Sequence, residues 1–145
     1  VPLSFVHYDS PLYLENPSLV RAGATDNEIE LMHAVARIVL HGFIDNIQVS
    51  WTKLGAEKAR NLLSMGVNDL GGTLMNESIS RAAGSKNGQE ITEAEMVQII
   101  RSARKTPIRR DTLYRTLKTY NQEDTIDNSS PLVSRNGSNP LSFLN

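Results

Sequence analysis

Residues Asn46–Gly55 read NIQVSWTKLG, and within them a strand pattern gives way to a helix pattern. Apolar Ile47 and Val49 alternate with polar residues up to Trp51, and this two-residue period is typical of a strand with one buried face. Apolar side chains at helical spacing follow directly over residues 55–64. The stretch therefore predicts one strand that leads into one helix.

The same order recurs on both sides of this stretch. A candidate strand at Leu3–Tyr8 precedes a helix that starts at a Thr25–Glu28 capping box. A very short strand over residues 67–70 precedes a helix that starts at a second box, Thr92–Glu95. This alternation implies parallel strands joined by crossover helices. Because a complete eightfold barrel needs about 250 residues, we expect an α/β fold with three or so β/α units, as an incomplete barrel or as part of a small open sheet.

The helix after Thr25 is expected to bury one apolar face, formed by residues at helical spacing: Ile29, Met32, Val35, Ala36 and Val39. The composition changes further along the chain. Residues 115–145 contain five Ser and five Asn, and their few apolar residues show no sustained period. We therefore expect an ordered domain over residues 1–114 and a disordered C-terminal tail over residues 115–145.

The composition excludes several classes of function. Fifteen Lys and Arg against 16 Asp and Glu give no general attraction to nucleic acid or to a membrane, so neither is expected as a partner. The basic run Arg104, Lys105, Arg109 and Arg110 lacks interleaved aromatic residues and indicates a solvated surface. No apolar run reaches the roughly 18 residues of a membrane span. Residues 1–9 do not resemble a secretory signal, so we expect a cytoplasmic location, with an organelle left open.

The chain has no cysteine, which excludes disulfides, thiolate zinc sites, a cysteine nucleophile and ligation of an iron–sulfur cluster by this chain. The histidines offer no metal site either. His33 and His41 lie eight residues apart in a predicted helix, too far apart to chelate one ion. His7 ends the first predicted strand, which is a suitable place for a site residue.

Polar side chains lie near the predicted strand ends, where a parallel barrel collects its ligands. If Ile47 and Val49 face the helices, Gln48 and Ser50 face the lumen, where they suit a binding site. The alternative is that these two side chains satisfy each other or bind water. Trp51 either covers the core or forms a stacking wall for a planar ligand.

Residues 68–77 read NDLGGTLMNE and form the most unusual segment of the chain. Two glycines allow a ligand to approach backbone N–H groups closely, and Thr73 adds a hydroxyl. This combination suits a carboxylate, a ribose or a phosphate. Taken alone, a Gly-Gly-Thr run is weak evidence, because double glycines most often form plain turns.

Several longer runs together resemble one known family. They are PLSFVHYDSPLYL (residues 2–14), LMHAVARIVLH (31–41), NIQVSWTKLG (46–55), GVNDLGGTLMNESISRAAG (66–84), NGQE (87–90) and RKTPIRRDTLY (104–114). Over residues 1–114 the chain resembles the C-terminal part of the FO synthase family, in its tyrosine-using half. The run NDLGGTLMNESISRAAG is the most specific part of the match.

The resemblance implies the C-terminal units of a radical S-adenosylmethionine (β/α) barrel. It implies a transferase that joins a tyrosine-derived 4-hydroxybenzyl group to 5-amino-6-(D-ribitylamino)uracil, a step in deazaflavin (coenzyme F-420) biosynthesis. The cofactors of the complete enzyme would be S-adenosylmethionine and a [4Fe–4S] cluster. The further partner would be a missing N-terminal barrel part or a partner chain.

Two departures limit what the resemblance implies. The family's cluster motif, C-x-x-x-C-x-x-C, has no counterpart here, because the chain has no cysteine. We therefore expect a fragment, a truncated product or one piece of a split enzyme, inactive alone. Residues 86–89 read KNGQ where relatives commonly carry His-Gly-Gln. The alternatives are a fragment of a menaquinone-pathway (futalosine-type) radical S-adenosylmethionine enzyme, or a non-catalytic barrel remnant that completes a partner chain.

By matching positions, the resemblance implies a set of substrate- or S-adenosylmethionine-binding residues at the strand ends. They are His7, Gln48, Ser50, Trp51, Lys53, Asn68, Asp69, Gly71, Gly72, Thr73, Asn76 and Glu77. Asp69 and Glu77 are expected to contact cationic or hydroxyl groups, and the two glycines to supply backbone donors. No catalytic residue and no metal ligand is assigned.

Overall fold

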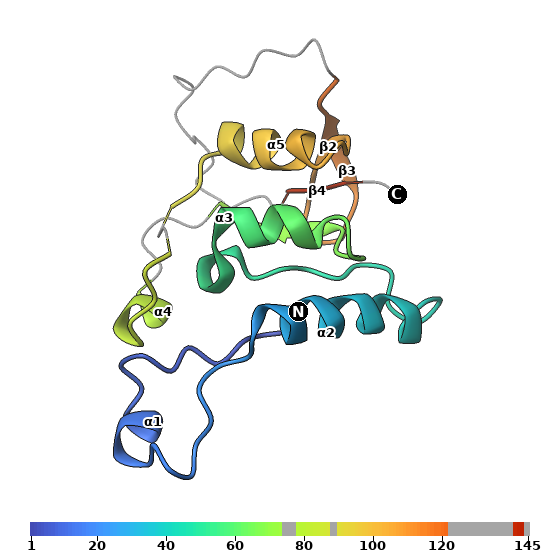
Figure 1. The fold of residues 1–145 in the computed structure, drawn as a ribbon. Helices are drawn as coiled ribbons and strands as arrows, with labels where there is room; N and C mark the ends of the chain where they lie inside the picture. Colours follow the sequence, from blue (N-terminus) through green and yellow to red (C-terminus); the bar gives the residue numbers. More distant parts are fainter. Residues whose placement is uncertain (74–77, 88–89, 122–140, 144–145) are drawn as a thin grey trace.

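The computed structural model describes residues 1–73, 78–87, 90–121 and 141–143 and has mixed helix and strand. Its helices are α1 (Pro11–Glu15), α2 (Asp26–Val39), α3 (Trp51–Leu62), α4 (Ile79–Ala82) and α5 (Glu93–Ser102). Its strands are β1 (Asp69–Gly71), β2 (Pro107–Arg110), β3 (Thr116–Thr119) and β4 (Leu141–Phe143). Figure 1 shows α5, α3 and α2 stacked in successive layers, with α1 and α4 together at one end. Within the described residues, no helix has the length and apolar character to cross a bilayer.

Helices α2 and α5 begin where the capping boxes predict. The Glu28 carboxylate accepts the Thr25 N–H at 2.8 Å, and the Glu95 carboxylate accepts the Thr92 N–H at 2.7 Å. Each threonine side chain in turn accepts an N–H of the first helical turn, which the helix itself cannot pair. The Arg21 guanidinium and the Thr25 N–H lower the pKa of Glu28 to about 2. The predicted starts of both helices are therefore confirmed.

The sheet differs from the expected parallel arrangement. Its order is β1-β4-β2-β3, and each pair of neighbouring strands in it is antiparallel. The predicted parallel neighbours do meet, at a single bridge between Gln48 and Asp69. The Val49 N–H donates to the Asp69 carbonyl at 3.0 Å beside that bridge. The contact stays short because α3 begins at Trp51, a residue that the alternation had placed in the strand.

Two segments differ from the expectations. Residues 3–8 form no strand; most of the segment is irregular. Within residues 115–145, expected as a disordered tail, the structure places β3 and β4, which both pair with β2; residues 122–140 and 144–145 of that range lie outside the described residues. All four residues of β3 are exposed, so its pairing uses main-chain hydrogen bonds that leave no apolar pattern in the sequence.

The core lies between α3, α5 and the strand-like residues that precede α3. Its least exposed members are Val49, Ala59, Leu62, Leu63, Val67, Leu70, Met96, Val97, Ile100 and Tyr120. Helix α2 contributes Ile29 and His33, with Ala36 packed at the edge. The other residues of its expected buried face, Met32, Val35 and Val39, are exposed, because α2 packs along the line of residues 29, 33 and 36 instead.

Candidate functional site

The candidate site residues fall into two groups that Trp51 connects. One group lies in a pocket between residues 4–8 and the start of α3. The other forms the glycine turn at the end of β1. The Trp51 indole N–H donates to the Gly72 carbonyl at 3.2 Å, so the residue that begins α3 also holds the glycine turn.

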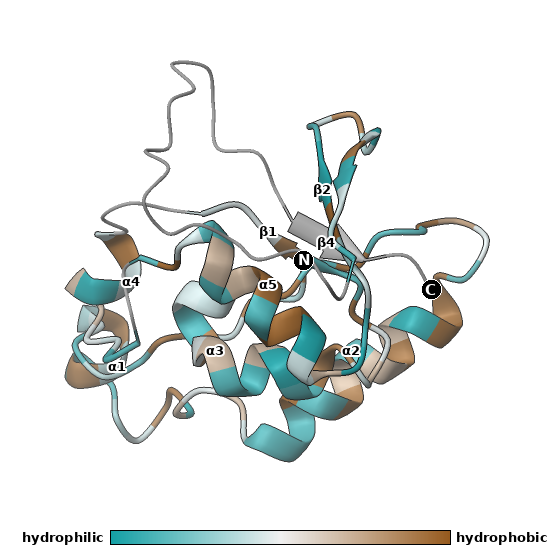
Figure 2. Ribbon diagram, turned by 90° about the horizontal axis from the view of Figure 1, so that it is seen from above, coloured by the Kyte–Doolittle hydropathy of each residue, from teal (hydrophilic) through white to brown (hydrophobic). Residues whose placement is uncertain are grey.

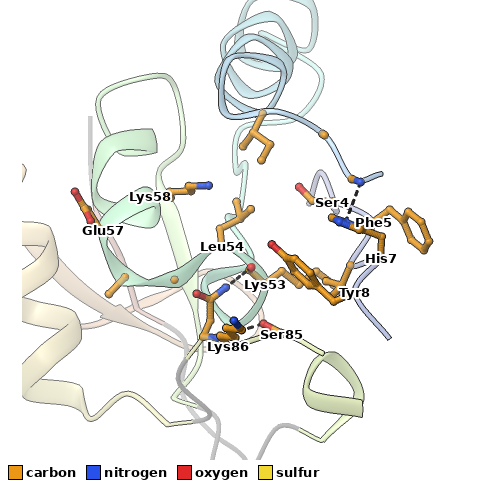
Figure 3. Close-up of a pocket in the computed structure, with 17 residues that line it drawn as sticks. Ser4, Phe5, His7, Tyr8, Lys53, Leu54, Glu57, Lys58, Ser85 and Lys86 are labelled. Atoms are coloured by element: carbon orange, nitrogen blue, oxygen red, sulfur yellow. Dashed lines mark hydrogen bonds between the residues drawn. The ribbon is translucent and has the colours of Figure 1, made fainter. Parts of the chain in front are cut away.

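The pocket has a volume of about 510 Å³ and contains His7 and Lys53. Figure 3 shows Ser4, Phe5 and His7 on one side and Leu54 and Lys58 of α3 on the other, with Lys53 and Tyr8 between them. Lys86, which follows α4, also lines the pocket. The pocket thus brings together segments that are far apart in the sequence.

The His7 ring has a fixed orientation. The Gly23 N–H donates to Nδ1 of His7 at 3.0 Å, so a neutral ring carries its proton on Nε2. Tyr8 packs on one side at a centroid distance of 4.4 Å, and Tyr13 meets the ring edge-on at 5.0 Å. A Cβ at position 23 would lie 2.4 Å from the Phe5 carbonyl oxygen, so only glycine allows this close approach. The Nε2–H of His7 is therefore a donor for a polar ligand atom.

Lys53 is held at the turn that opens α3. Its ammonium lies 3.4 Å from the Ser80 hydroxyl, and its carbonyl accepts a hydrogen bond from the Asn87 amide. Gly55 follows with φ 81° and ψ 166°, which interrupts the helix just after Lys53. A Cβ on Gly55 would lie 2.9 Å from the Asn87 amide oxygen. The local sequence therefore fixes the backbone of Lys53, which lines the pocket.

The pocket carries more positive than negative charge. Three lysines line it, Lys53, Lys58 and Lys86, against one acidic residue, Glu57. Lys58 is already ion-paired with Asp26 on α2. Lys53 and Lys86 therefore remain as the cations that suit a carboxylate or another anionic group.

The glycine turn is built around the Asp69 carboxylate. One oxygen accepts the Gly71 N–H at 2.7 Å, and the other is ion-paired with the Arg110 guanidinium. Asp69 is fully buried, at 0% exposure. Gly71 has φ +74°, and a Cβ there would lie 2.4 Å from the Gln48 amide nitrogen. The expected ligand contacts of Asp69 and Gly71 are thus occupied within the protein.

Arg110 is a residue that the sequence interpretation misplaced. The basic run was expected to be a solvated surface, but the Arg110 side chain is only 5% exposed. Besides Asp69, its guanidinium donates to the Asp111 carbonyl at 2.9 Å. Within the described residues, its buried Nε has no hydrogen-bond partner. The available signal was the two-residue period of β2, which puts Arg110 on the same face as buried Ile108.

A tight turn after β2 places Tyr114 against this arginine. The Asp111 carboxylate accepts the N–H groups of Leu113 and Arg115 at 2.8 and 2.9 Å. These hydrogen bonds, the one from Arg115 above all, lower the pKa of Asp111. Tyr114 has φ 62°, and its ring centroid lies 3.9 Å from the Arg110 guanidinium carbon. The RRDTLY run thus closes over the buried ion pair.

Asn68 and Ser50 have internal partners. The Asn68 amide oxygen accepts from Arg37 at 2.8 Å and from the Ile47 N–H at 2.9 Å, and its nitrogen donates to the Asp45 carbonyl at 3.2 Å. The Ser50 hydroxyl lies 3.2 Å from the Thr52 hydroxyl, which is a different partner from the Gln48 amide considered above. Asn68 therefore connects the segments that precede β1 and α3.

The structure brings some predicted site residues together and not others. His7 and Lys53 share the pocket, whereas Gln48, Trp51, Asp69, Gly71 and Gly72 meet at the glycine turn. Thr73 follows the turn and is half-buried. Asn76 and Glu77 lie outside the described residues. Within the described part of the chain, no three His, Asp or Glu side chains gather into a metal site.

Comparison with known proteins identifies close relatives. The family model described as "CofH/MqnC C-terminal region" matches residues 1–123. The 5-amino-6-(D-ribitylamino)uracil--L-tyrosine 4-hydroxyphenyl transferase of Methanopyrus kandleri is 48% identical over 120 residues, which are 83% of this chain and 32% of that protein. The FO synthase of Mycobacterium leprae is 50% identical over 114 residues, which are 79% of this chain and 13% of that protein.

A third relative, the transferase of the same name from Methanococcoides burtonii, is 45% identical over 121 residues, which are 81% of this chain and 33% of that protein. No solved structure matches the chain. The chain spans about a third of the length of the two transferases and matches their C-terminal part. The predicted resemblance to FO synthase is therefore confirmed. Because the family model covers most of its length, this chain belongs to the CofH/MqnC C-terminal region family.

Proposed function

We propose that this chain is the C-terminal part of a radical S-adenosylmethionine transferase that joins a tyrosine-derived 4-hydroxybenzyl group to 5-amino-6-(D-ribitylamino)uracil. The observation that carries the proposal is the 48% identity, over 83% of this chain, to a relative named for those two substrates. We further propose that the three layers of helix and the short parallel contact belong to the last units of the family's barrel. A cytoplasmic location stays a prediction.

The residues of this chain do not fit a [4Fe–4S] cluster. The chain has no cysteine, and its described residues hold no cluster of His, Asp or Glu that could replace cysteine. The cluster ligands of the complete enzyme would come from the part of the relatives that this chain does not match. We therefore assign no step of the radical chemistry to residues of this chain.

The pocket supports a role for this chain in binding an amino-acid ligand. S-adenosylmethionine, when bound in the complete enzyme, supplies the radical chemistry, and both it and tyrosine carry an α-carboxylate. The Lys53 ammonium, fixed between Ser80 and the Gly55 break, is placed to bind that carboxylate. The His7 Nε2–H is placed to donate to a second ligand oxygen. The glycine turn then acts as support, since Asp69 and Gly71 bind each other.

A chimera tests this proposal. This chain replaces the matched C-terminal part of the Methanopyrus kandleri transferase, and product formation is measured after anaerobic reconstitution. A Lys53→Met variant removes one charge-assisted hydrogen bond to the ligand carboxylate. The KM for either tyrosine or S-adenosylmethionine, whichever of them Lys53 binds, should therefore rise by about 10- to 100-fold. Lys118→Met is the matched control, because Lys118 lies on exposed β3, over the Tyr120 ring. Equal KM values for both variants would contradict the role of Lys53.

A second candidate function is that of a non-catalytic chain that completes a partner's barrel; with no cysteine of its own, the chain depends on another part for the cluster under either candidate. The two candidates differ in what happens in trans. A transferase part restores product formation when it is mixed with the remaining part of the relative, whereas a non-catalytic remnant binds that part without restoring product.

A further inference from the structure

Helix α2 carries an exposed apolar surface that nothing in the described structure covers. We call it the α2 stripe and define it by five residues: Leu31, Met32, Val35, Ile38 and Val39. Their exposed fractions are 64, 57, 44, 76 and 66%. Figure 2 shows the ribbon of α2 brown over much of its C-terminal half.

The α2 stripe is separate from the face that α2 buries in the core. Leu31, Val35 and Ile38 follow the i, i+4, i+7 spacing of a single helix face. The buried residues Ile29 and His33 lie on a different face. A helix that is apolar on two faces is typical of burial on two sides, and this structure covers only one of them.

The apolar surface continues beyond the helix. Phe43 and Ile44, just after α2, are 88% and 47% exposed. Residues 2–5 line a shallow pocket together with Met32, and Val1 and Leu3 are 62% and 65% exposed. Large contiguous apolar patches are rare on soluble monomers, so this concentration of exposed apolar side chains on and beside α2 points to an interface.

From this surface we infer that the α2 stripe packs against the N-terminal part of the same enzyme, the part of the relatives that lies outside the match. This inference rests on the proposed function, in which the chain is the C-terminal third of a transferase. About two thirds of the length of the Methanopyrus kandleri relative lies outside the match, which covers 32% of it. In such a protein the preceding chain arrives at residues 1–5, which adjoin Met32. The proposed occupant of the α2 stripe is thus an apolar surface of the N-terminal part, which connects to this chain beside the stripe.

The test is the double substitution Leu31→Asp with Ile38→Asp, made in this chain alone and in the chimera with the Methanopyrus kandleri N-terminal part. In this chain alone both side chains are exposed, so the melting temperature should change by less than about 3 °C. In the chimera the two carboxylates would be buried at the interface, so the melting temperature should fall by about 10 °C or more. Leu113→Asp is the matched control, because Leu113 is 71% exposed after β2 and should be neutral in both proteins.

A chimera that melts at the same temperature with and without the double substitution would overturn the inference. A chimera that fails to fold even with the unsubstituted α2 stripe would also overturn it. If sedimentation shows a dimer of this chain that the double substitution abolishes, while the chimera is unaffected, the occupant is a second copy and the inference is wrong. The melting temperature does not depend on whether the chimera forms product. A chimera that is inactive, but whose melting temperature falls with the double substitution, would therefore support this interface and contradict the proposed function.

Discussion

Replacing Arg110 by methionine tests how the glycine turn is held. The partner carboxylate of Asp69 is 0% exposed, and the Arg110 side chain is 5% exposed. Removal of the guanidinium leaves Asp69 buried with only the Gly71 N–H as a described partner. Breaking a buried ion pair in this way costs about 3–5 kcal/mol. A domain has only about 5–15 kcal/mol of stability in total, so Arg110→Met should remove a large share of it.

The assay is urea unfolding of this chain, followed by circular dichroism. Arg109→Met is the matched control on the same strand, because the Arg109 side chain is 33% exposed and its nearest carboxylate, Glu93, lies 3.5 Å away and is 26% exposed. A partly solvated pair of this kind contributes about 0–1 kcal/mol. The double variant Asp69→Asn with Arg110→Met removes both charges, and it should be less destabilised than Arg110→Met alone.

Two results would refute this reasoning. If Arg110→Met and Arg109→Met lower the free energy of unfolding equally, burial does not distinguish the two arginines. A double variant whose loss equals the sum of the two single losses would show that Asp69 and Arg110 do not interact.

Three further predictions concern the turn, the helix cap and the cluster. Gly71→Ala forces a Cβ toward Gln48 at φ +74°, so it should lower the free energy of unfolding in urea by about 1–3 kcal/mol. Gly42→Ala is the control, with φ +79° and open space around the new Cβ, and should lower it by about 1 kcal/mol. Equal decreases for the two variants would contradict the packing argument. Because the folded pKa of Glu28 is lowered from 4.5 to about 2, its contribution to stability is complete above pH 4.5 and is lost as the pH falls toward 2. Thermal melts of Glu28→Gln should therefore depend less on pH in this window than those of the unsubstituted chain, and parallel curves would count against the prediction. Anaerobic reconstitution of this chain alone should leave no stoichiometric iron and no cluster absorption band; their presence would show that the chain ligates a cluster without cysteine.

The features that sequence predicted best are those set by nearby residues. The capping boxes at Thr25 and Thr92 join residues three positions apart, so the sequence alone contains both partners. Gln48 and Asp69 were also predicted to lie on neighbouring strands, and the structure pairs them at one bridge. Their pairing follows from the β/α order, which a periodicity argument can detect.

The features that the sequence did not reveal depend on partners far away in the chain or on hydrogen bonds between main-chain groups. Arg110 reaches Asp69 across 41 positions, so its partner is not visible in the neighbouring sequence; the two-residue period of β2 marks only the face that it shares with Ile108. Strand β3 is exposed throughout and pairs through its backbone, so its sequence resembles a tail. On α2, two apolar faces compete, and the sequence does not state which one the described residues cover. His7 was placed at the end of a strand and lies instead in a loop, held by Gly23.

If this chain supplies the C-terminal third of a transferase acting on tyrosine and 5-amino-6-(D-ribitylamino)uracil, as we propose, it must support product formation in the Methanopyrus kandleri chimera. The measurement is mass spectrometry of the chimera's reaction products, after anaerobic reconstitution and with both substrates present. The reference is the same protein with its C-terminal third deleted. We predict that the chimera forms the product in which the 4-hydroxybenzyl group of tyrosine is joined to the uracil, and that the deleted protein does not. A chimera that folds and holds its cluster but forms no such product would contradict the claim.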